Sequence, residues 1–255
     1  MESVWNDVGS LSIHGRVSKR SFAADRIPIV FVHGLGVSMR YMEPTMALLA
    51  QEHPVAGLDM PGFGRSATPR RAFSVRELAD ALEQWLDIRN LGPALFVGNS
   101  FGCQVIVECA TRSPARAVGL VLNAPTMDPA HRTVFGQFVR VIADIPREPV
   151  LLAMHVALDY LRVGPFRLTA TLRTALADRI EEKLPHLAVP TLVVCGARDP
   201  VVTAEWGDQV ARLVGSQRDG ASGGTLRVIP GAAHALPYDD PETFAESILS
   251  VYARV

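Results

Sequence analysis

The sequence predicts an α/β fold in which a mostly parallel β-sheet is covered by helices on both faces. Two observations lead to this prediction: short apolar runs rich in β-branched residues recur along the 255 residues, and helical patterns separate several of them. Strands that alternate with helices usually form a parallel sheet. We expect strands at residues 27–32, 55–58, 94–97, 118–122, 191–195 and 226–229.

The clearest predicted helix begins at Ser74. The sequence Ser-Val-Arg-Glu at 74–77 is a capping box, in which Ser74 and Glu77 each satisfy a backbone amide of the first turn. Apolar residues then follow at helical spacing until Gly92 and Pro93, which should end the helix. Further helices are expected from about Ser100 to Arg112, from about Thr203 to Val214 and from Pro241 onward, with a loop rich in glycine and serine at 220–224.

The segment 127–187 departs from the alternating pattern. About sixty residues pass without a convincing strand, while Pro146, Pro149 and Pro165 divide the segment into short helical pieces. We therefore expect a helical cap inserted at 126–187 into a core domain made of residues 1–125 and 188–255.

Composition limits the classes of partner that the chain can have. With 48% hydrophobic residues, the chain is long enough to bury a large core. Its net charge of −1 and scattered arginines argue against nucleic acid, which binds clustered basic residues. Apolar runs fall short of the roughly 20 residues of a membrane span, and residues 1–15 lack the pattern of a secretory signal. We therefore expect neither a nucleic-acid nor a membrane partner; the oligomeric state is left open.

The three cysteines indicate the redox setting. Cys103, Cys109 and Cys195 are odd in number, lie in apolar contexts and lack the spacing of metal ligands. Such residues are typical of buried free thiols and favour a reducing, cytoplasmic location. The sequence predicts neither a metal site nor an organic cofactor.

The motif Gly-Asn-Ser-Phe-Gly at 98–102 follows a predicted strand and precedes a predicted helix. This is the context of a nucleophile elbow, a turn so tight that the flanking positions hold little more than hydrogen. The turn would present the Ser100 hydroxyl above the edge of the sheet. A glycine-rich structural turn is the alternative interpretation.

A serine nucleophile needs a base to take its proton, and the base needs a carboxylate to orient it. His234 lies just past the last predicted strand and has the best context of the seven histidines. Asp199 follows the predicted strand at 191–195, again at the carboxyl edge where α/β sheets carry their sites. Asp128 is an alternative acid that keeps the same chain order, and Asp239 and Asp240 are more distant alternatives.

An oxyanion needs two donors already in place. The Phe101 amide is one, because this residue follows the nucleophile. The second should come from His-Gly-Leu-Gly at 33–36, where small residues such as Gly34 let the backbone approach the substrate. We favour the Leu35 amide over that of Gly34, and we expect His33 to act as a hydrogen-bonding brace.

A competing signal is Gly-Phe-Gly-Arg-Ser-Ala at 62–67, with Asp80 further on, which has the look of a dinucleotide fingerprint. Such a site needs a helix opened by the glycines. Pro69 interrupts that helix, and the capping box places its start at Ser74, so we reject this interpretation.

Taken together, these segments resemble the α/β-hydrolase superfamily. The resemblance rests on HGLG at 33–36, DMPGFGRS at 59–66, GNSFG at 98–102, GARDP at 196–200 and GAAHALPYDDP at 231–241. It implies the α/β-hydrolase fold with a variable cap, with Ser100, Asp199 and His234 as nucleophile, acid and base. A serine at the elbow separates the chain from related dehalogenases and epoxide hydrolases, which use an aspartate.

The expected substrate is a small, largely apolar molecule. Phe135, Phe138, Met154, Tyr160 and Phe166 are candidates to line an apolar pocket, with packing inside the cap as their alternative role.

The first hypothesis for function is an esterase, lactonase or thioesterase that forms an acyl-enzyme. The second is a carbon-carbon bond hydrolase of vinylogous diketones, because the elbow GNSFG resembles the elbow of these enzymes. The chain differs from them in two ways: Ala235 stands where they have a tryptophan, and no asparagine follows HGLG. The third is a ligand receptor without turnover on the same fold.

Overall fold

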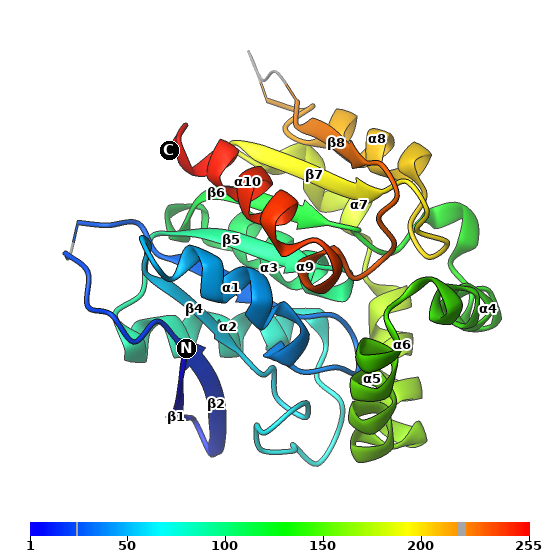
Figure 1. Ribbon diagram of the computed structural model, residues 1–255, viewed down its shortest axis with the longest axis horizontal. Helices are drawn as coiled ribbons and strands as arrows, with labels where there is room; N and C mark the ends of the chain where they lie inside the picture. The colour runs from blue at the N-terminus through cyan, green and yellow to red at the C-terminus, as the bar shows by residue number, and fades with distance from the viewer. Residues whose placement is uncertain (24, 219–222) are drawn as a thin grey trace.

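The computed structural model describes residues 1–23, 25–218 and 223–255 and confirms the α/β fold class. Its eight-stranded sheet has the order β1-β2-β4-β3-β5-β6-β7-β8, in which β3 to β8 run parallel and β1 and β2 are antiparallel neighbours at one edge (Figure 1). The strands are β1 Glu2–Val8, β2 Leu11–Val17, β3 Ile29–Val32, β4 Val55–Leu58, β5 Ala94–Asn99, β6 Ala117–Asn123, β7 Thr191–Gly196 and β8 Thr225–Ile229.

Helices cover both faces of this sheet, and each face has its own buried apolar cluster. One cluster contains residues of α2, α3 and α8, including Trp85, Ile106 and Trp206. The other contains residues of α1 and α10, including Met46 and Phe244. The helices outside the segment 126–187 are α1 Glu43–Leu49, α2 Val75–Arg89, α3 Phe101–Arg112, α8 Ala204–Leu213, α9 Leu236–Asp239 and α10 Pro241–Tyr252.

The start of α2 is as expected, but its end is earlier. Ser74 Oγ accepts from the Glu77 amide at 3.3 Å, and Glu77 Oε2 accepts from the Ser74 amide at 2.9 Å, which completes the capping box. The helix ends at Arg89 because Asn90 adopts a left-handed conformation with φ of 53°, a conformation that asparagine tolerates. Gly92 and Pro93 therefore lie beyond the helix end. Of the predicted loop at 220–224, residues 220–222 lie outside the described residues.

The hairpin β1–β2 was not predicted from the sequence. It pairs Glu2 with Val17 through to Val8 with Leu11, and Gly9 with φ of 58° supplies the turn. Because β1 lies at the sheet edge and most of its residues are at least partly exposed, it has no apolar run that would mark it as a strand.

Between β6 and β7 lies the cap segment (residues 126–187, all of them described), which contains helices joined by short loops and no strand. Its helices are α4 Val134–Asp144, α5 Val150–Val163, α6 Pro165–Ala177 and α7 Ile180–Lys183. Helices α4, α5 and α6 lie beyond the carboxyl ends of the central strands (Figure 1). The core holds this segment by buried hydrogen bonds, from the Ser38 hydroxyl to Asp159 at 2.7 Å and from Gln104 Nε2 to the Ala175 carbonyl at 3.0 Å. The division of the chain into two domains stays a prediction.

Candidate active site

The three residues proposed for catalysis lie at one edge of the sheet. Ser100 directly follows β5, Asp199 lies three residues past β7, and His234 lies five residues past β8. Because these strands are parallel, their carboxyl ends meet at the same edge, where open α/β sheets bind ligands.

The turn that carries Ser100 is sterically demanding. Ser100 has φ of 55° and ψ of −120°, a conformation that costs free energy for any residue with a side chain. A Cβ atom added at Gly98 would lie 2.8 Å from the Cys103 amide nitrogen. At Gly102 it would overlap the Val32 carbonyl oxygen and lie 2.8 Å from that of His33. Both flanking glycines are therefore required by the backbone packing that presents Ser100 at the end of β5.

His234 and Asp199 form a pair in which the carboxylate is buried and the imidazole is partly exposed. The His234 Nδ1 atom lies 2.7 Å from Asp199 Oδ2. The other carboxylate oxygen of Asp199 accepts hydrogen bonds from the amides of Val201 at 2.7 Å and Val202 at 3.0 Å. Since both oxygens are held, the carboxylate can fix the orientation of the imidazole, leaving Nε2 as its free nitrogen.

The charge of the carboxylate also changes the pKa of the imidazole. Burial acts to lower the pKa of His234, but the charge and hydrogen bond of Asp199, together with the charges of Asp144 and Glu148, raise it to about 9. The negative surroundings therefore stabilise the imidazolium that a general base becomes when it takes a proton.

The alternative acids make other contacts. Asp128 accepts from the Ala130 amide at 2.8 Å and pairs with His131 Nδ1 at 2.8 Å, both within the cap segment. Asp240 accepts from the Thr243 amide and caps α10. Among the described residues, Asp199 is the one carboxylate that hydrogen-bonds His234.

A buried hydrogen-bond chain joins the loops that carry the site. The Gly34 amide donates to the Tyr41 hydroxyl at 3.0 Å, and this hydroxyl donates to Asn99 Oδ1 at 2.6 Å. Asn99 Nδ2 in turn donates to the His234 carbonyl at 3.4 Å. The chain thus connects the loop at 33–36, the elbow and the histidine loop. In the described part of the chain, the Ser100 hydroxyl itself has no hydrogen-bond partner.

These contacts also separate the candidates for the oxyanion donors. The Gly34 amide is occupied by Tyr41, whereas the amides of Leu35 and Phe101 donate to no group among the described residues. A Cβ atom at Gly34 would lie 3.4 Å from the Ser100 Cβ atom, so the loop at 33–36 passes directly beside the elbow. The free amides of Leu35 and Phe101 therefore fit the predicted pair of donors.

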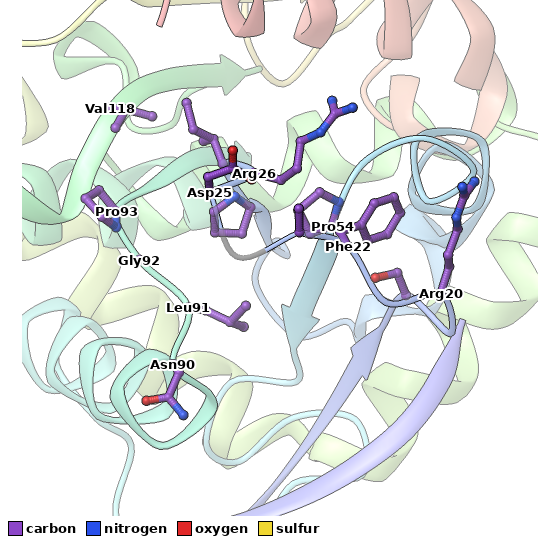
Figure 2. A pocket seen from close by; sticks show the side chains of 14 residues that line it. Arg20, Phe22, Asp25, Arg26, Pro54, Asn90, Leu91, Gly92, Pro93 and Val118 are labelled. Atoms are coloured by element: carbon purple, nitrogen blue, oxygen red, sulfur yellow. The ribbon is translucent and has the colours of Figure 1, made fainter.

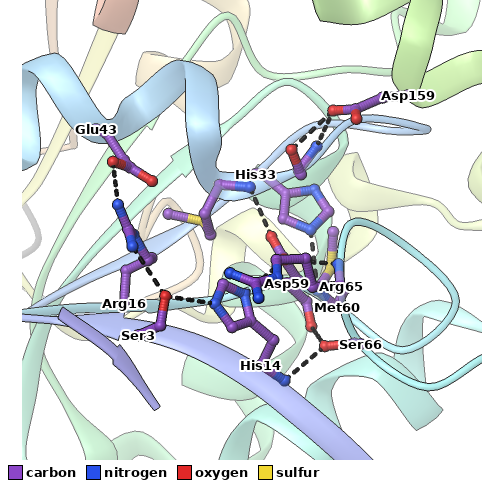
Figure 3. A network of polar contacts seen from close by, with 12 residues as sticks. Ser3, His14, Arg16, His33, Glu43, Asp59, Met60, Arg65, Ser66 and Asp159 are labelled. Carbon is purple, nitrogen blue, oxygen red and sulfur yellow. Dashed lines mark hydrogen bonds and ion pairs between the residues drawn. The ribbon is translucent and has the colours of Figure 1, made fainter. Parts of the chain in front are cut away.

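His33 holds the loop at 33–36 against the turn that follows β4 (Figure 3). Its Nδ1 atom lies 2.7 Å from the Gly34 carbonyl, and its Nε2 atom accepts from the Met60 amide at 2.9 Å. Because Nε2 accepts from an amide, it carries no proton, and burial lowers the pKa of His33, which favours this neutral form. Asp59 is fixed beside it by hydrogen bonds from His14 Nδ1 at 2.8 Å and from the Arg65 amide at 2.9 Å.

Sequence reasoning missed two acids near His234, Asp144 and Glu148, which lie beside the alternative acid Asp239. The Glu148 carboxylate accepts from the Ala235 amide at 2.9 Å, and burial raises the pKa values of Asp144 and Glu148. Burial and the neighbouring Glu148 raise the pKa of Asp239 to about 8. A signal was present in the sequence, because Asp144 and Glu148 are the only acids between residues 129 and 158.

Four of the five residues expected to line an apolar pocket are largely exposed, including Phe166 at 92%. Phe135, Phe138 and Met154 have exposed fractions of 77%, 60% and 58%. Tyr160 of α5, the remaining candidate, and Leu168 of α6 approach the loop at 33–36 closely enough to overlap a Cβ atom placed at Gly36. This contact brings two apolar side chains of the cap segment to the predicted oxyanion loop.

A hollow of about 360 Å³ lies at the opposite edge of the sheet (Figure 2). Phe22, Pro54, Leu91 and Val118 are among its lining residues, which contain no histidine or cysteine. These residues lie near the amino ends of the central strands, so the hollow is separate from the carboxyl edge where Ser100 lies.

The described residues contain no candidate metal site and no candidate membrane span. Within residues 1–23, 25–218 and 223–255, no group of three or more histidine, cysteine or acidic side chains could hold a metal ion. Over the same ranges, no helix has the length and apolar character needed to cross a bilayer. The three cysteines are buried and unpaired, and burial raises the pKa of the Cys103 thiol well above its usual value.

A parallel sheet with a strained serine at the end of a central strand and a histidine–aspartate pair at the same edge defines an α/β hydrolase. The chain belongs to the Alpha/beta hydrolase family, whose model matches residues 29–247, and it is a hydrolase-type enzyme.

Similar proteins cover the chain to different extents. It is 34% identical over 120 residues to abhydrolase domain-containing protein abhd-5.2 of Caenorhabditis elegans, covering 44% of this chain but only 27% of that protein. It is 26% identical to the pimeloyl-[acyl-carrier protein] methyl ester esterase of Neisseria meningitidis serogroup B (strain H44/76), covering 90% of this chain and 95% of the relative. The solved structure of Est816, an N-acyl homoserine lactone degrading enzyme, has a TM-score of 0.81 at 23% identity and covers 97% of this chain and 99% of its own, a likeness of fold.

Proposed function

We propose that this protein is a serine hydrolase that cleaves an ester-like bond in a small, largely apolar molecule. The observation that carries this proposal is the Asp199–His234 pair, whose histidine carbonyl accepts a hydrogen bond from the Asn99 side chain next to Ser100. A nucleophile, a base and an orienting carboxylate at one sheet edge are what acyl transfer through a serine requires.

In the proposed mechanism, the Ser100 oxygen attacks the carbonyl carbon of the substrate while His234 Nε2 takes the hydroxyl proton. The amides of Leu35 and Phe101 donate to the oxyanion. The imidazolium then gives its proton to the leaving oxygen, so that an alcohol departs and an acyl group stays on Ser100. A water molecule, deprotonated by His234, attacks this acyl-enzyme, and collapse of the second tetrahedral intermediate releases the acid and restores the serine.

Two observations support an ester, lactone or thioester as the bond that is cleaved. The full-length relative from Neisseria meningitidis is a methyl ester esterase, and Est816 degrades a lactone, which is a cyclic ester. In addition, Tyr160 and Leu168 bring apolar surface to the loop at 33–36, which suits a largely apolar acyl group.

The test is a burst experiment with an activated aryl ester on the full chain. We expect the native protein to release one equivalent of phenol rapidly, and Ser100→Ala to show no burst. Ser250→Ala, which removes an exposed hydroxyl on α10, is the matched control and should behave as the native protein does. Absence of both a burst and labelling of Ser100 by a serine-directed phosphonate would favour a receptor, and turnover of a vinylogous diketone alone would favour the carbon-carbon bond hydrolase.

A further inference from the structure

The cap segment contains a helix whose amphipathic character is reversed. The side of α4 that faces the core carries Gln137, Arg140 and Asp144: Gln137 is buried, Arg140 donates to the Pro200 and Val201 carbonyls at 3.2 and 3.0 Å, and the charge of Asp144 acts on His234. The opposite side carries Phe135, Phe138 and Ile142, which are exposed. A helix on a protein in water normally turns its apolar side inward.

Helix α5 continues the exposed apolar surface. Leu152 and Asp159 face the core and are buried, whereas Val150, Met154 and Leu161 lie at helical spacing on the other side and are exposed by 78%, 58% and 78%. Twelve of the 17 large hydrophobic residues that are exposed in the described part of the chain lie between residues 134 and 166. Patches of this kind mark a surface that is covered by a partner or a membrane.

In the same stretch, the acidic side chains face the core and the exposed charged side chains are basic. Between residues 134 and 177, all of which are described, the three acids point inward: Asp144 and Glu148 lie near the histidine loop, and Asp159 accepts from Ser38. The exposed charged side chains of this stretch are Arg147, Arg162 and Arg173, of which Arg162 also lies 3.5 Å from Asp159 Oδ1. The outer surface is therefore apolar and positively charged.

We propose that the outer face of α4 and α5 docks on an anionic lipid surface. Apolar side chains flanked by arginines on short helices are the pattern of interfacial helices, which lie in the headgroup region instead of crossing the bilayer. A second copy of the chain fits less well, because a symmetric contact places the same face on both subunits and would bring like charges together with no exposed acid to pair them. Docking would place the cap helices between the lipid and the carboxyl edge of the sheet (Figure 1).

This proposal departs from the expectation of no membrane partner, which rested on the absence of an apolar run long enough to span a bilayer. The proposal concerns binding alone, and its test needs no turnover, so its outcome is independent of the proposed hydrolase activity.

The experiment is flotation of the full chain with vesicles of phosphatidylcholine alone or mixed with phosphatidylglycerol. We expect binding to the mixed vesicles that weakens at high salt. Phe135→Ser/Phe138→Ser should reduce partitioning by about tenfold or more, because two exposed rings lose their apolar contact. Arg147→Glu/Arg162→Glu should lower binding to the anionic vesicles by at least about fivefold per arginine while leaving the weak binding to phosphatidylcholine unchanged.

Ile88→Ser is the matched control, since Ile88 is an exposed apolar residue on α2, which lies outside the cap segment. It should float as the native protein does, and circular dichroism should show that every variant is folded. The proposal is overturned if the native chain does not bind phosphatidylglycerol vesicles, or if Ile88→Ser loses binding as strongly as the phenylalanine variant. Light scattering that shows a dimer broken by Phe135→Ser/Phe138→Ser, without binding to vesicles, would assign the face to a second copy instead.

Discussion

Removing the Tyr41 hydroxyl tests whether the buried hydrogen-bond chain holds the site together. The Tyr41→Phe substitution keeps the ring, which is only 6% exposed, and deletes the oxygen that accepts from the Gly34 amide and donates to Asn99 Oδ1. Two buried polar groups then lose their partner, and each such loss costs about 1–3 kcal/mol. Part of this loss is offset, because the variant no longer buries a hydroxyl group. We therefore expect the free energy of unfolding to fall by about 2–4 kcal/mol.

The same substitution should also lower activity. Without the hydroxyl, the loop at 33–36 is no longer connected to the Asn99 side chain, which donates to the His234 carbonyl. Because small displacements of positioned groups have large effects on rate, we expect kcat for an activated ester to fall by about tenfold or more.

Tyr252→Phe is the matched control for stability. Its hydroxyl donates to the Ile27 carbonyl at 3.1 Å in a partly buried position, where water can replace the lost bond, so the expected cost is below about 1 kcal/mol. The measurement is urea unfolding followed by circular dichroism, with the slope of the transition compared between variants. The reasoning is refuted if Tyr41→Phe is no less stable than Tyr252→Phe, or if its kcat is unchanged.

Three other predictions follow from the site. Asp199→Asn should lower kcat by orders of magnitude, whereas Asp128→Asn, which alters the cap of a short helical turn, should leave kcat nearly unchanged. The reverse ranking in steady-state assays would assign the acid to Asp128. Because a general base acts when neutral and the pKa of His234 is raised to about 9, kcat/KM should rise with pH up to about 9. Glu148→Gln keeps an acceptor for the Ala235 amide but removes a charge, so the rise of kcat/KM should shift to lower pH, and an unshifted profile contradicts the assignment. Gly102→Ala should destabilise the fold by about 3 kcal/mol or more in thermal or urea unfolding, since the added methyl group overlaps the Val32 backbone; unfolding at the native midpoint would contradict the packing.

The raised pKa of His234 has a consequence for stability as well. A histidine whose pKa is higher in the folded state than in the unfolded chain binds its proton more tightly when folded. Its contribution to stability is therefore fully present below about pH 6.5, the pKa of an unperturbed histidine, and is lost as the pH rises through about 9.

Local steric rules explain why much of the site could be predicted from the sequence. The elbow needs small residues at Gly98 and Gly102, and these stand next to Ser100 in the chain, so the motif is visible without any tertiary information. The Ser74 capping box is local in the same sense. Asp199 and His234 could be inferred because each follows a strand, and parallel strands bring their carboxyl ends together.

The rest of the site depends on contacts between distant residues. Tyr41 and Asn99 are 58 positions apart, and Asn99 and His234 are 135 positions apart, so no local pattern reveals their hydrogen bonds. The hairpin β1–β2 was missed because an exposed edge strand needs no apolar run. The exposure of Phe135 and Phe138 was missed for a different reason: periodicity identifies an amphipathic helix but does not say which side faces the core.

The reversed helix α4 links the two proposals through its charges. Its inner side brings Asp144 close enough to raise the pKa of His234, while its outer side exposes Phe135 and Phe138. A movement of α4 that carries Asp144 away from the histidine removes a negative charge from its surroundings and so lowers its pKa.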